Sequence, residues 1–239
     1  MTIANPDMSF PGRREVSGLD FRSPARIQSS FLAASERGFL DFLCSRMPPW
    51  ITPDVLTAIG VAGAIVTAIG YLGTNASPSF LALASFGIIV NWFGDSLDGS
   101  LARYRGVERH QYGFFLDHSM DAASNLIIAV GLGLSPYVGM DAALFALVGY
   151  LMLGLSVFLS THVSGRLHLS FLGFGPTELR LTVILFNIAI YVIGPVSVHF
   201  AGQPVSLHSI SVIVLGAILI GLFVFNVCRT ASELAEEAP

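Results

Sequence analysis

Four aspartates lie close together in the sequence, at a place where lipid should exclude them. Asp95, Asp98, Asp117 and Asp121 fall within two long apolar runs. A carboxylate at the middle of a membrane helix costs roughly 2.5 to 3.5 kcal/mol even on lenient insertion scales. Like charges at close range also repel one another, so four converging carboxylates cannot all stay ionised without compensation. The residue types therefore predict a site for divalent cations.

The ligand type narrows the choice of metal. A set of carboxylates without histidine favours Mg²⁺ or Mn²⁺ over Zn²⁺. Mg²⁺ is commonly held by carboxylates together with substrate phosphates, and two such ions can clamp the oxygens of a phosphoryl displacement. We expect two ions per site and an anionic substrate that completes their coordination shells.

The spacing of the aspartates predicts one shared pocket. Asp95 and Asp98 are three residues apart and Asp117 and Asp121 are four apart, so each pair shares one helix face. If the two helices are antiparallel neighbours, joined by the loop around residues 107–112, Asp95 lies at the depth of Asp121 and Asp98 at the depth of Asp117. At 1.5 Å per residue, all four lie within roughly 12 Å of the helix ends. Such a pocket opens to the cytosol and is reached sideways from lipid.

Small residues and one arginine accompany the aspartates. Gly99, Ala102 and Gly113 allow a ligand or another helix to approach the backbone closely. Each of them taken alone is explained by helix packing. Arg103, at the mouth of the pocket, can hold a phosphate or pair with one of the carboxylates.

The elements that position these residues are membrane helices. With 53% hydrophobic and only 12% charged residues, the chain is an integral membrane protein rather than a soluble domain. The predicted fold class is an all-α membrane protein with six transmembrane helices after an interfacial amphipathic helix. Segments long enough to span the bilayer run from Asp54 to Leu72, Ser79 to Arg103, Gly113 to Leu134, Asp141 to Val163, Leu179 to Ile193, and Ser209 to Val227. We divide the chain into a flexible cytosolic tail (1–27), the amphipathic helix (28–50), the catalytic domain (51–228) and a second cytosolic tail (229–239).

The segment before the first span has a helical apolar stripe. Its apolar side chains are Leu32, Phe39, Leu40, Leu43 and Met47, and its opposite side carries Glu36, Arg37, Asp41 and Arg46. This pattern predicts a helix in the membrane interface. A helix docked against the protein's own loops is the alternative.

Charge placement predicts the orientation. All 12 basic residues are arginines, and every one falls on the same side if six spans alternate. Because basic residues favour the cytosolic side, both termini and the aspartate site should be cytosolic, in a multi-pass protein of the cell's inner membrane. The first thirty residues show no cleavable signal peptide. Cys44 and Cys228 are expected to be free thiols.

The motif D-x-x-D-G-x-x-A-R-x9-G-x-x-x-D-x-x-x-D resembles that of the CDP-alcohol phosphotransferase (CDP-alcohol phosphatidyltransferase) family. The resemblance holds at every specified position: Asp95, Asp98, Gly99, Ala102, Arg103, Gly113, Asp117 and Asp121. It extends more loosely to TPDVLTAIG (Thr52 to Gly60) and to the count of six spans. The N-terminal tail shows none.

The resemblance implies an activity and roles for these residues. Members transfer a substituted phosphate from a CDP-linked donor, commonly CDP-diacylglycerol, to a small alcohol and release CMP, in phospholipid biosynthesis. Asp95, Asp98 and Asp117 would hold one metal, and Asp95, Asp117 and Asp121 the other. Asp121 would also be the general base for the acceptor hydroxyl. The CDP moiety would lie against Gly99, Ala102, Arg103 and Gly113. The family implies a homodimer and lipid partners, and no nucleic-acid partner is expected.

The loop between the fourth and fifth spans is expected to roof the acceptor site. Arg166 and Arg180 could bind a phosphate on the acceptor. Arginines at cytosolic helix ends are also explained by topology alone, and Glu178 could pair with one of them. His110, His118, His199 and His208 receive no catalytic role. The alcohol stays open between glycerol 3-phosphate, an inositol phosphate, serine and an amino alcohol.

Two other classes of protein place acidic residues in membrane helices. A Mg²⁺-dependent membrane prenyltransferase binds a diphosphate, and Asn91 with Asp95 matches N-x-x-x-D. However, the spans are too few for it, and its chemistry does not ask for D-G-x-x-A-R. A divalent-cation transporter is the other alternative, but the outer halves of these spans are almost wholly apolar.

Overall fold

The computed structural model describes residues 25–27, 33–164, 166–168, 175–200 and 203–237. Nearly all of the predicted tail, 1–27, lies outside this range. The helices are α1 (Ala33–Arg46), α2 (Pro53–Gly73), α3 (Phe80–Arg105), α4 (His110–Gly133), α5 (Met140–Ser164), α6 (Pro176–Ile193) and α7 (Leu207–Glu237). The strands are the parallel pair β1 (Ala25–Ile27) and β2 (Arg166–His168), and the antiparallel pair β3 (Ser197–Phe200) and β4 (Gln203–Ser206).

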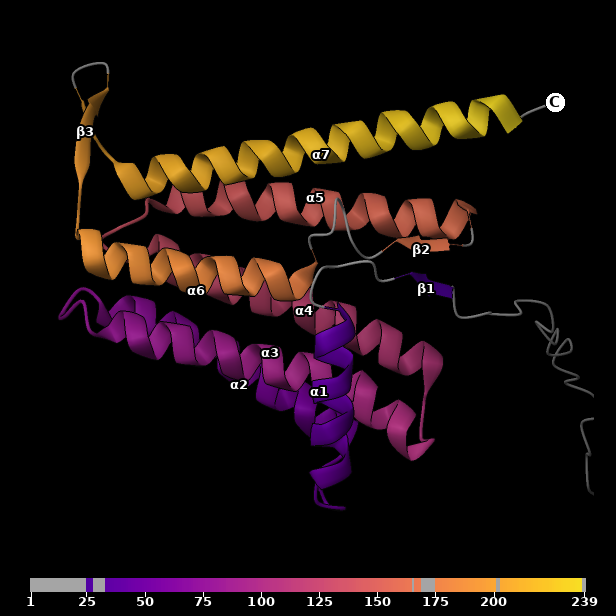
Figure 1. Cartoon of the computed structure of the whole chain (residues 1–239). Coiled ribbons are helices and arrows are strands. Elements are labelled where there is room, and N and C mark those ends of the chain that lie inside the picture. Colours follow the sequence, from indigo (N-terminus) through magenta and orange to yellow (C-terminus); the bar gives the residue numbers. More distant parts are fainter. Residues whose placement is uncertain (1–24, 28–32, 165, 169–174, 201–202, 238–239) are drawn as a thin grey trace, which may run out of the picture.

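The long helices form one bundle in which consecutive helices alternate in direction (Figure 1). The β3–β4 pair lies at one end of the bundle, and the turn from α3 to α4 lies at the other. The prediction of an all-α membrane fold is confirmed. Among the described helices, α2, α3, α5, α6 and α7 are long and apolar enough to cross a membrane. Since α4 is not among these five, the predicted count of six spans is not established.

Local signals in the sequence set the ends of the helices that carry the aspartates. The Thr52 hydroxyl accepts a hydrogen bond from the Val55 backbone N–H at 3.3 Å, with Pro53 in the first helical position of α2. Gly106 ends α3 with a left-handed φ of 64°, a conformation that favours glycine. The chain can then turn sharply into α4, so that both aspartate pairs lie near one end of the bundle.

Glycines bring α2 and α3 into close backbone contact. A Cβ on Gly63 would clash with the backbone of Asn91, and a Cβ on Gly94 would clash with the backbone of Gly60. Close approach of this kind is typical of membrane helix pairs. The Asn91 side chain crosses the same interface and donates a hydrogen bond to the Gly60 carbonyl at 3.0 Å. These contacts hold the face of α3 that carries Asp95 and Asp98 against α2.

The structure changes one assumption about the aspartate helices. We expected the helices bearing the two aspartate pairs, now α3 and α4, to be direct neighbours. Instead both pack against α2, and they contact each other little. Gly131 of α4 lies so close to α2 that a Cβ there would clash with Ala68. Because α3 and α4 pack on α2 rather than on each other, a space remains between their aspartate-bearing parts.

Helix α1 is docked against α3 of the bundle. Leu40 and Cys44 are buried in a cluster with Leu97 and Leu101 of α3. Phe39, by contrast, is 50% exposed. The expected placement of Glu36 on the outer side was wrong, because Glu36 accepts hydrogen bonds from side chains of α3 and α6.

Cys44 and Cys228 are both free thiols, and burial raises the pKa of the Cys44 thiol.

Candidate active site

A small cavity that is open to solvent lies among α2, α3 and α4. It is lined by residues of all three helices. Its lining residues are Thr57, Gly60, Val61, Asn91, Asp95, Asp98, Asp117, Met120, Asp121 and Ser124. All four predicted aspartates therefore border one cavity, which is what the helical spacing required.

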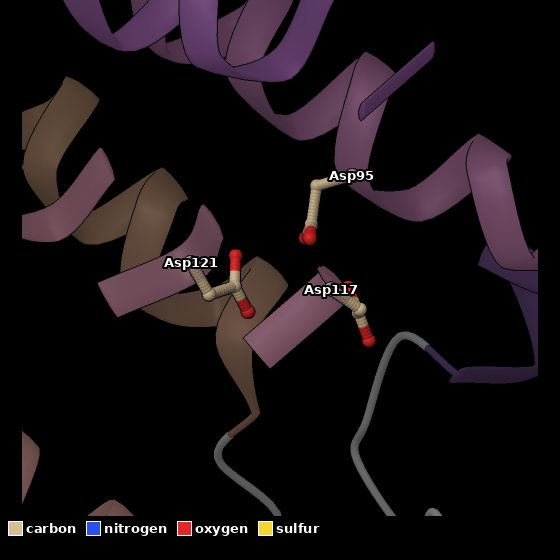
Figure 2. Close-up of side chains that lie close together, drawn as sticks. All are labelled: Asp95, Asp117 and Asp121. Atoms are coloured by element: carbon tan, nitrogen blue, oxygen red, sulfur yellow. The ribbon is translucent and has the colours of Figure 1, made fainter. Parts of the chain in front are cut away.

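Three of the aspartates form a compact group. One carboxylate oxygen each of Asp95, Asp117 and Asp121 lies within 4.8 Å of the other two. Figure 2 shows Asp95 from α3 facing the two aspartates of α4 across the gap between the helices. Oxygens at this separation can bind one common cation, and the all-carboxylate donor set fits Mg²⁺ or Mn²⁺. The protein thus has a cluster that could hold a divalent metal.

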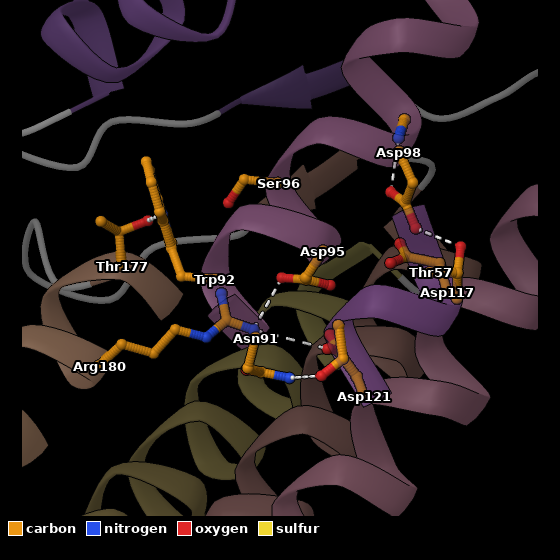
Figure 3. A network of polar contacts seen from close by, with 12 residues as sticks. Thr57, Asn91, Trp92, Asp95, Ser96, Asp98, Asp117, Asp121, Thr177 and Arg180 are labelled. Carbon is orange, nitrogen blue, oxygen red and sulfur yellow. Dashed lines mark hydrogen bonds and ion pairs between the residues drawn. The ribbon is translucent and has the colours of Figure 1, made fainter. Parts of the chain in front are cut away.

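Asp98 borders the same cavity but has a different set of contacts. Its side chain is 7% exposed, and Oδ2 accepts a hydrogen bond from the Thr57 hydroxyl at 2.6 Å. Oδ1 lies 2.5 Å from the Gly99 backbone N–H, which donates to it. Figure 3 shows Asp98 beside Thr57 and Asp117. The contact with Thr57 was not anticipated, although the TPDVLTAIG segment that contains Thr57 was noted for its resemblance to the family.

Arg180 of α6 reaches directly into the aspartate group. Its Nη2 donates a hydrogen bond to Asp95 Oδ2 at 2.7 Å and lies 3.7 Å from Asp121 Oδ1. The side chains of the Arg180–Asp95 pair are 17% and 19% exposed, so screening by solvent is limited. The guanidinium offsets part of the negative charge. We expected Arg180 to belong to a loop that covers the acceptor site. Instead it lies on α6 and contacts Asp95 and Asp121 directly.

The residues expected around the CDP moiety lie at the end of the cavity region nearest the α3–α4 turn. Gly99 and Ala102 are half-buried on α3, and Gly113 is exposed at the start of α4. A Cβ on Gly113 would meet no described atom within 4 Å, and one on Gly99 would come closest to the Arg103 guanidinium at 3.4 Å. Arg103 is exposed and donates a hydrogen bond to Ser100 at 3.1 Å. The space around both glycines is open to a ligand.

The remaining polar residues considered in the sequence analysis are Arg166 and Glu178 of the predicted acceptor region and His118 of the motif. The side chain of Arg166 lies outside the described residues. Glu178 accepts a hydrogen bond from the Gly175 backbone N–H at 2.9 Å and so caps the start of α6. His118, which received no role, has Nδ1 2.8 Å from the Phe114 carbonyl oxygen and 3.5 Å from Asp117 Oδ2.

Comparisons with known proteins agree with the motif. Residues 50–223 match the CDP-alcohol phosphatidyltransferase family. Cholinephosphotransferase 1 of Danio rerio is 26% identical over 157 residues, which are 62% of this chain and 40% of that protein. Archaetidylinositol phosphate synthase of Pyrococcus horikoshii is 33% identical over 106 residues, which are 44% of this chain and 53% of that protein. The chain thus spans about half of the length of these relatives or less. Since the family match covers most of the chain and includes all four aspartates of the cavity, the chain belongs to the CDP-alcohol phosphatidyltransferase family.

Proposed function

We propose that this protein transfers a substituted phosphate from a CDP-linked donor to the hydroxyl of an alcohol and releases CMP, within a membrane. One observation carries the proposal: the carboxylates of Asp95, Asp117 and Asp121 lie close together beside the Arg180 guanidinium. They come from two helices, α3 and α4, that contact each other little. A packing role alone would not gather three carboxylates in a membrane helix bundle. The family match favours phosphotransfer over the prenyltransferase and cation-transporter alternatives.

The proposed roles of the residues follow the chemistry of a diphosphate donor. Two Mg²⁺ or Mn²⁺ ions would be held by Asp95, Asp98, Asp117 and Asp121, and they would supply charge neutralisation at the diphosphate. Gly99, Ala102, Arg103 and Gly113 bind the CDP moiety. Asp121 accepts the proton of the acceptor hydroxyl, whose oxygen forms the new bond to phosphorus while the bond to CMP breaks. Arg180 orients an acceptor that carries a phosphate, with Arg166 in support.

The relatives leave the acceptor open. One is named for choline phosphate transfer and the other for an archaetidylinositol phosphate product. An arginine next to the catalytic carboxylates favours an anionic acceptor such as glycerol 3-phosphate or an inositol phosphate over serine or a neutral amino alcohol, because a guanidinium binds phosphate oxygens in pairs. We expect both termini and the site to face the cytosol of the inner membrane. The expected state is a homodimer, which cross-linking in native membranes would detect as a doubled mass.

The test uses purified protein in detergent with Mg²⁺. CDP-diacylglycerol is supplied with glycerol 3-phosphate, inositol phosphate, serine or ethanolamine in separate reactions, and CMP release and the lipid product are followed. A second series with CDP-choline and diacylglycerol covers the chemistry for which the Danio rerio relative is named. Alcohol-dependent CMP release with one acceptor is the expected result. A lack of release in both series, by protein that is folded and metal-loaded, would contradict the proposal.

A further inference from the structure

Glu36 of α1 is bound by side chains of two other helices. Its Oε1 accepts hydrogen bonds from the Thr177 hydroxyl at 2.8 Å, from Trp92 Nε1 at 3.2 Å and from the Ser96 hydroxyl at 3.4 Å. Trp92 and Ser96 are four residues apart on α3, and Thr177 is in the first turn of α6. The three donors gather on one side of the aspartate group (Figure 3). One carboxylate oxygen therefore joins α1, α3 and α6.

A carboxylate is a costly choice for this position. The residues at the next two turns of the same face, Leu40 and Cys44, are buried and apolar. Oε2 of Glu36 is itself buried and accepts no hydrogen bond from the part of the chain that the structure describes. An apolar residue of similar size would dock α1 without this desolvation penalty. Helix docking alone does not explain why the residue is acidic.

The docking of α1 has other supports. The Phe39 ring stacks on the Trp92 indole with ring centroids 6.3 Å apart. Near the C-terminal end of α1, the Arg105 guanidinium donates hydrogen bonds to the carbonyl oxygens of Met47 and Pro48 at 3.2 and 2.9 Å. The middle of α1 and the residues directly after it are thus attached to α3 without Glu36. The contact that Glu36 adds is the one to α6.

Two of the side chains that donate hydrogen bonds to Glu36 are close in sequence to residues of the candidate site. Ser96 directly follows Asp95. Thr177 precedes Arg180 by three residues on α6, so both side chains lie on one face of that helix. The Arg180–Asp95 pair connects α6 to α3 at 2.7 Å, and Glu36 connects the same two helices about one turn away. Trp92 Nε1 also donates a hydrogen bond to the Thr177 hydroxyl oxygen at 3.3 Å. The first turn of α6, and hence Arg180, is held by these three contacts together.

We infer that Glu36 is a positioning residue, which holds the first turn of α6 through Thr177 so that Arg180 reaches the site in the geometry needed for the acceptor. The inference rests on the proposed function, because it assigns Arg180 to the acceptor. Glu36 itself touches neither substrate nor the reacting atoms. Its loss should therefore affect the acceptor more than the CDP-linked donor or the metal.

The experiment compares Glu36→Ala, Glu36→Gln and Asp41→Ala in the full-length protein. Steady-state kinetics are measured with glycerol 3-phosphate and with inositol phosphate. Glu36→Ala should raise the acceptor KM about tenfold, the size expected for a lost hydrogen bond to a charged group. The donor KM and the Mg²⁺ midpoint should change little. Glu36→Gln keeps an oxygen acceptor for Thr177 and should stay within about threefold of wild type. Asp41 is exposed on the same helix, so Asp41→Ala should behave as wild type.

A double variant checks the route through α6. If Glu36 acts through Thr177, Glu36→Ala combined with Thr177→Val should raise the acceptor KM no further than Glu36→Ala alone. An unchanged acceptor KM in Glu36→Ala would overturn the inference. So would a loss that falls equally on donor, metal and acceptor and follows the fall in melting temperature. A wild-type protein that releases no CMP would instead refute the proposed function, so the two failures are distinguishable.

Discussion

At the scale of single residues, Asp121 is the one aspartate with two proposed roles: it binds metal and it accepts a proton. Asp121→Asn keeps the size of the side chain and one oxygen ligand but removes the base. We expect donor binding to persist and kcat to fall by about 10²- to 10⁴-fold, the usual contribution of general base catalysis. Donor binding is measured by nucleotide titration and turnover by CMP release. Asp41→Asn, on the exposed side of α1, is the matched control, and full turnover in Asp121→Asn would refute the assignment.

Substitution of Asp98 tests metal binding separately from proton transfer. Asp98→Ala removes a carboxylate that borders the cavity but lies apart from the three-aspartate group. We expect Mg²⁺-dependent binding of the cytidine nucleotide to need about 10- to 100-fold more Mg²⁺. A Mg²⁺ titration in detergent measures this shift. Thr57→Val removes the hydroxyl that hydrogen-bonds to Asp98 and to the Pro53 carbonyl oxygen and should cause a smaller shift in the same direction. An unchanged curve in Asp98→Ala would contradict the metal assignment.

Arg180 tests the class of acceptor. If the acceptor carries a phosphate, Arg180→Ala should raise its KM by about 10- to 100-fold, because a charged hydrogen bond to the phosphate is lost. Arg166→Ala should act in the same direction. Arg229, which pairs with Glu233 on the exposed surface of α7, supplies the control variant Arg229→Ala. Unaltered acceptor kinetics in both Arg166→Ala and Arg180→Ala would leave these arginines as markers of topology.

At the scale of helices, the site depends on the close contact of α2 with α3. Gly94→Ala would place a methyl group against the Gly60 backbone nitrogen and the Leu56 carbonyl oxygen, and no side-chain rotation can relieve a clash with backbone. We expect the variant to lose about 1 to 3 kcal/mol of stability, seen as a lower melting temperature in detergent. Activity should fall as well, because Asp95 follows Gly94 directly.

A matched change elsewhere separates crowding from helix propensity. Gly154→Ala in α5 adds the same methyl group where no described atom lies within 4 Å. Alanine is the better helix former, so this variant should melt at or above the wild-type temperature. If Gly94→Ala were equally well tolerated, the close α2–α3 interface would not be what positions the aspartates.

At the scale of the whole molecule, the ends of the bundle should lie on opposite sides of the membrane. In a protein whose two cysteines are replaced by alanine, Val198→Cys adds a thiol in the β3–β4 pair and Ser232→Cys adds one near the end of α7. An impermeant maleimide applied to intact cells should label Val198→Cys, and should label Ser232→Cys only after permeabilisation. We expect this pattern because basic residues favour the cytosolic side and Arg229 lies near the C-terminal end of α7. The reverse pattern would place the site on the outer side.

The sequence by itself determined the class of fold, the four aspartates and the family. Apolar runs predict membrane helices because backbone polar groups must be satisfied internally in lipid, and the helical period places Asp95 with Asp98 and Asp117 with Asp121. These inferences need only local geometry. The motif and the family match over residues 50–223 agree, whereas the roles of the individual residues remain predictions.

The tertiary structure alone decided which helices meet. Three features depend on packing between segments up to 85 residues apart in the sequence: α3 and α4 both pack on α2, Thr57 contacts Asp98, and Arg180 reaches Asp95. Glu36 shows the reason most clearly. Its spacing of four residues from Leu40 places it on the apolar face of α1, although its charge led us to expect it on the opposite side, and only the structure shows the donors that α3 and α6 supply to its carboxylate. Helical periodicity describes one helix at a time, whereas the contacts of a buried polar group are set by its neighbours.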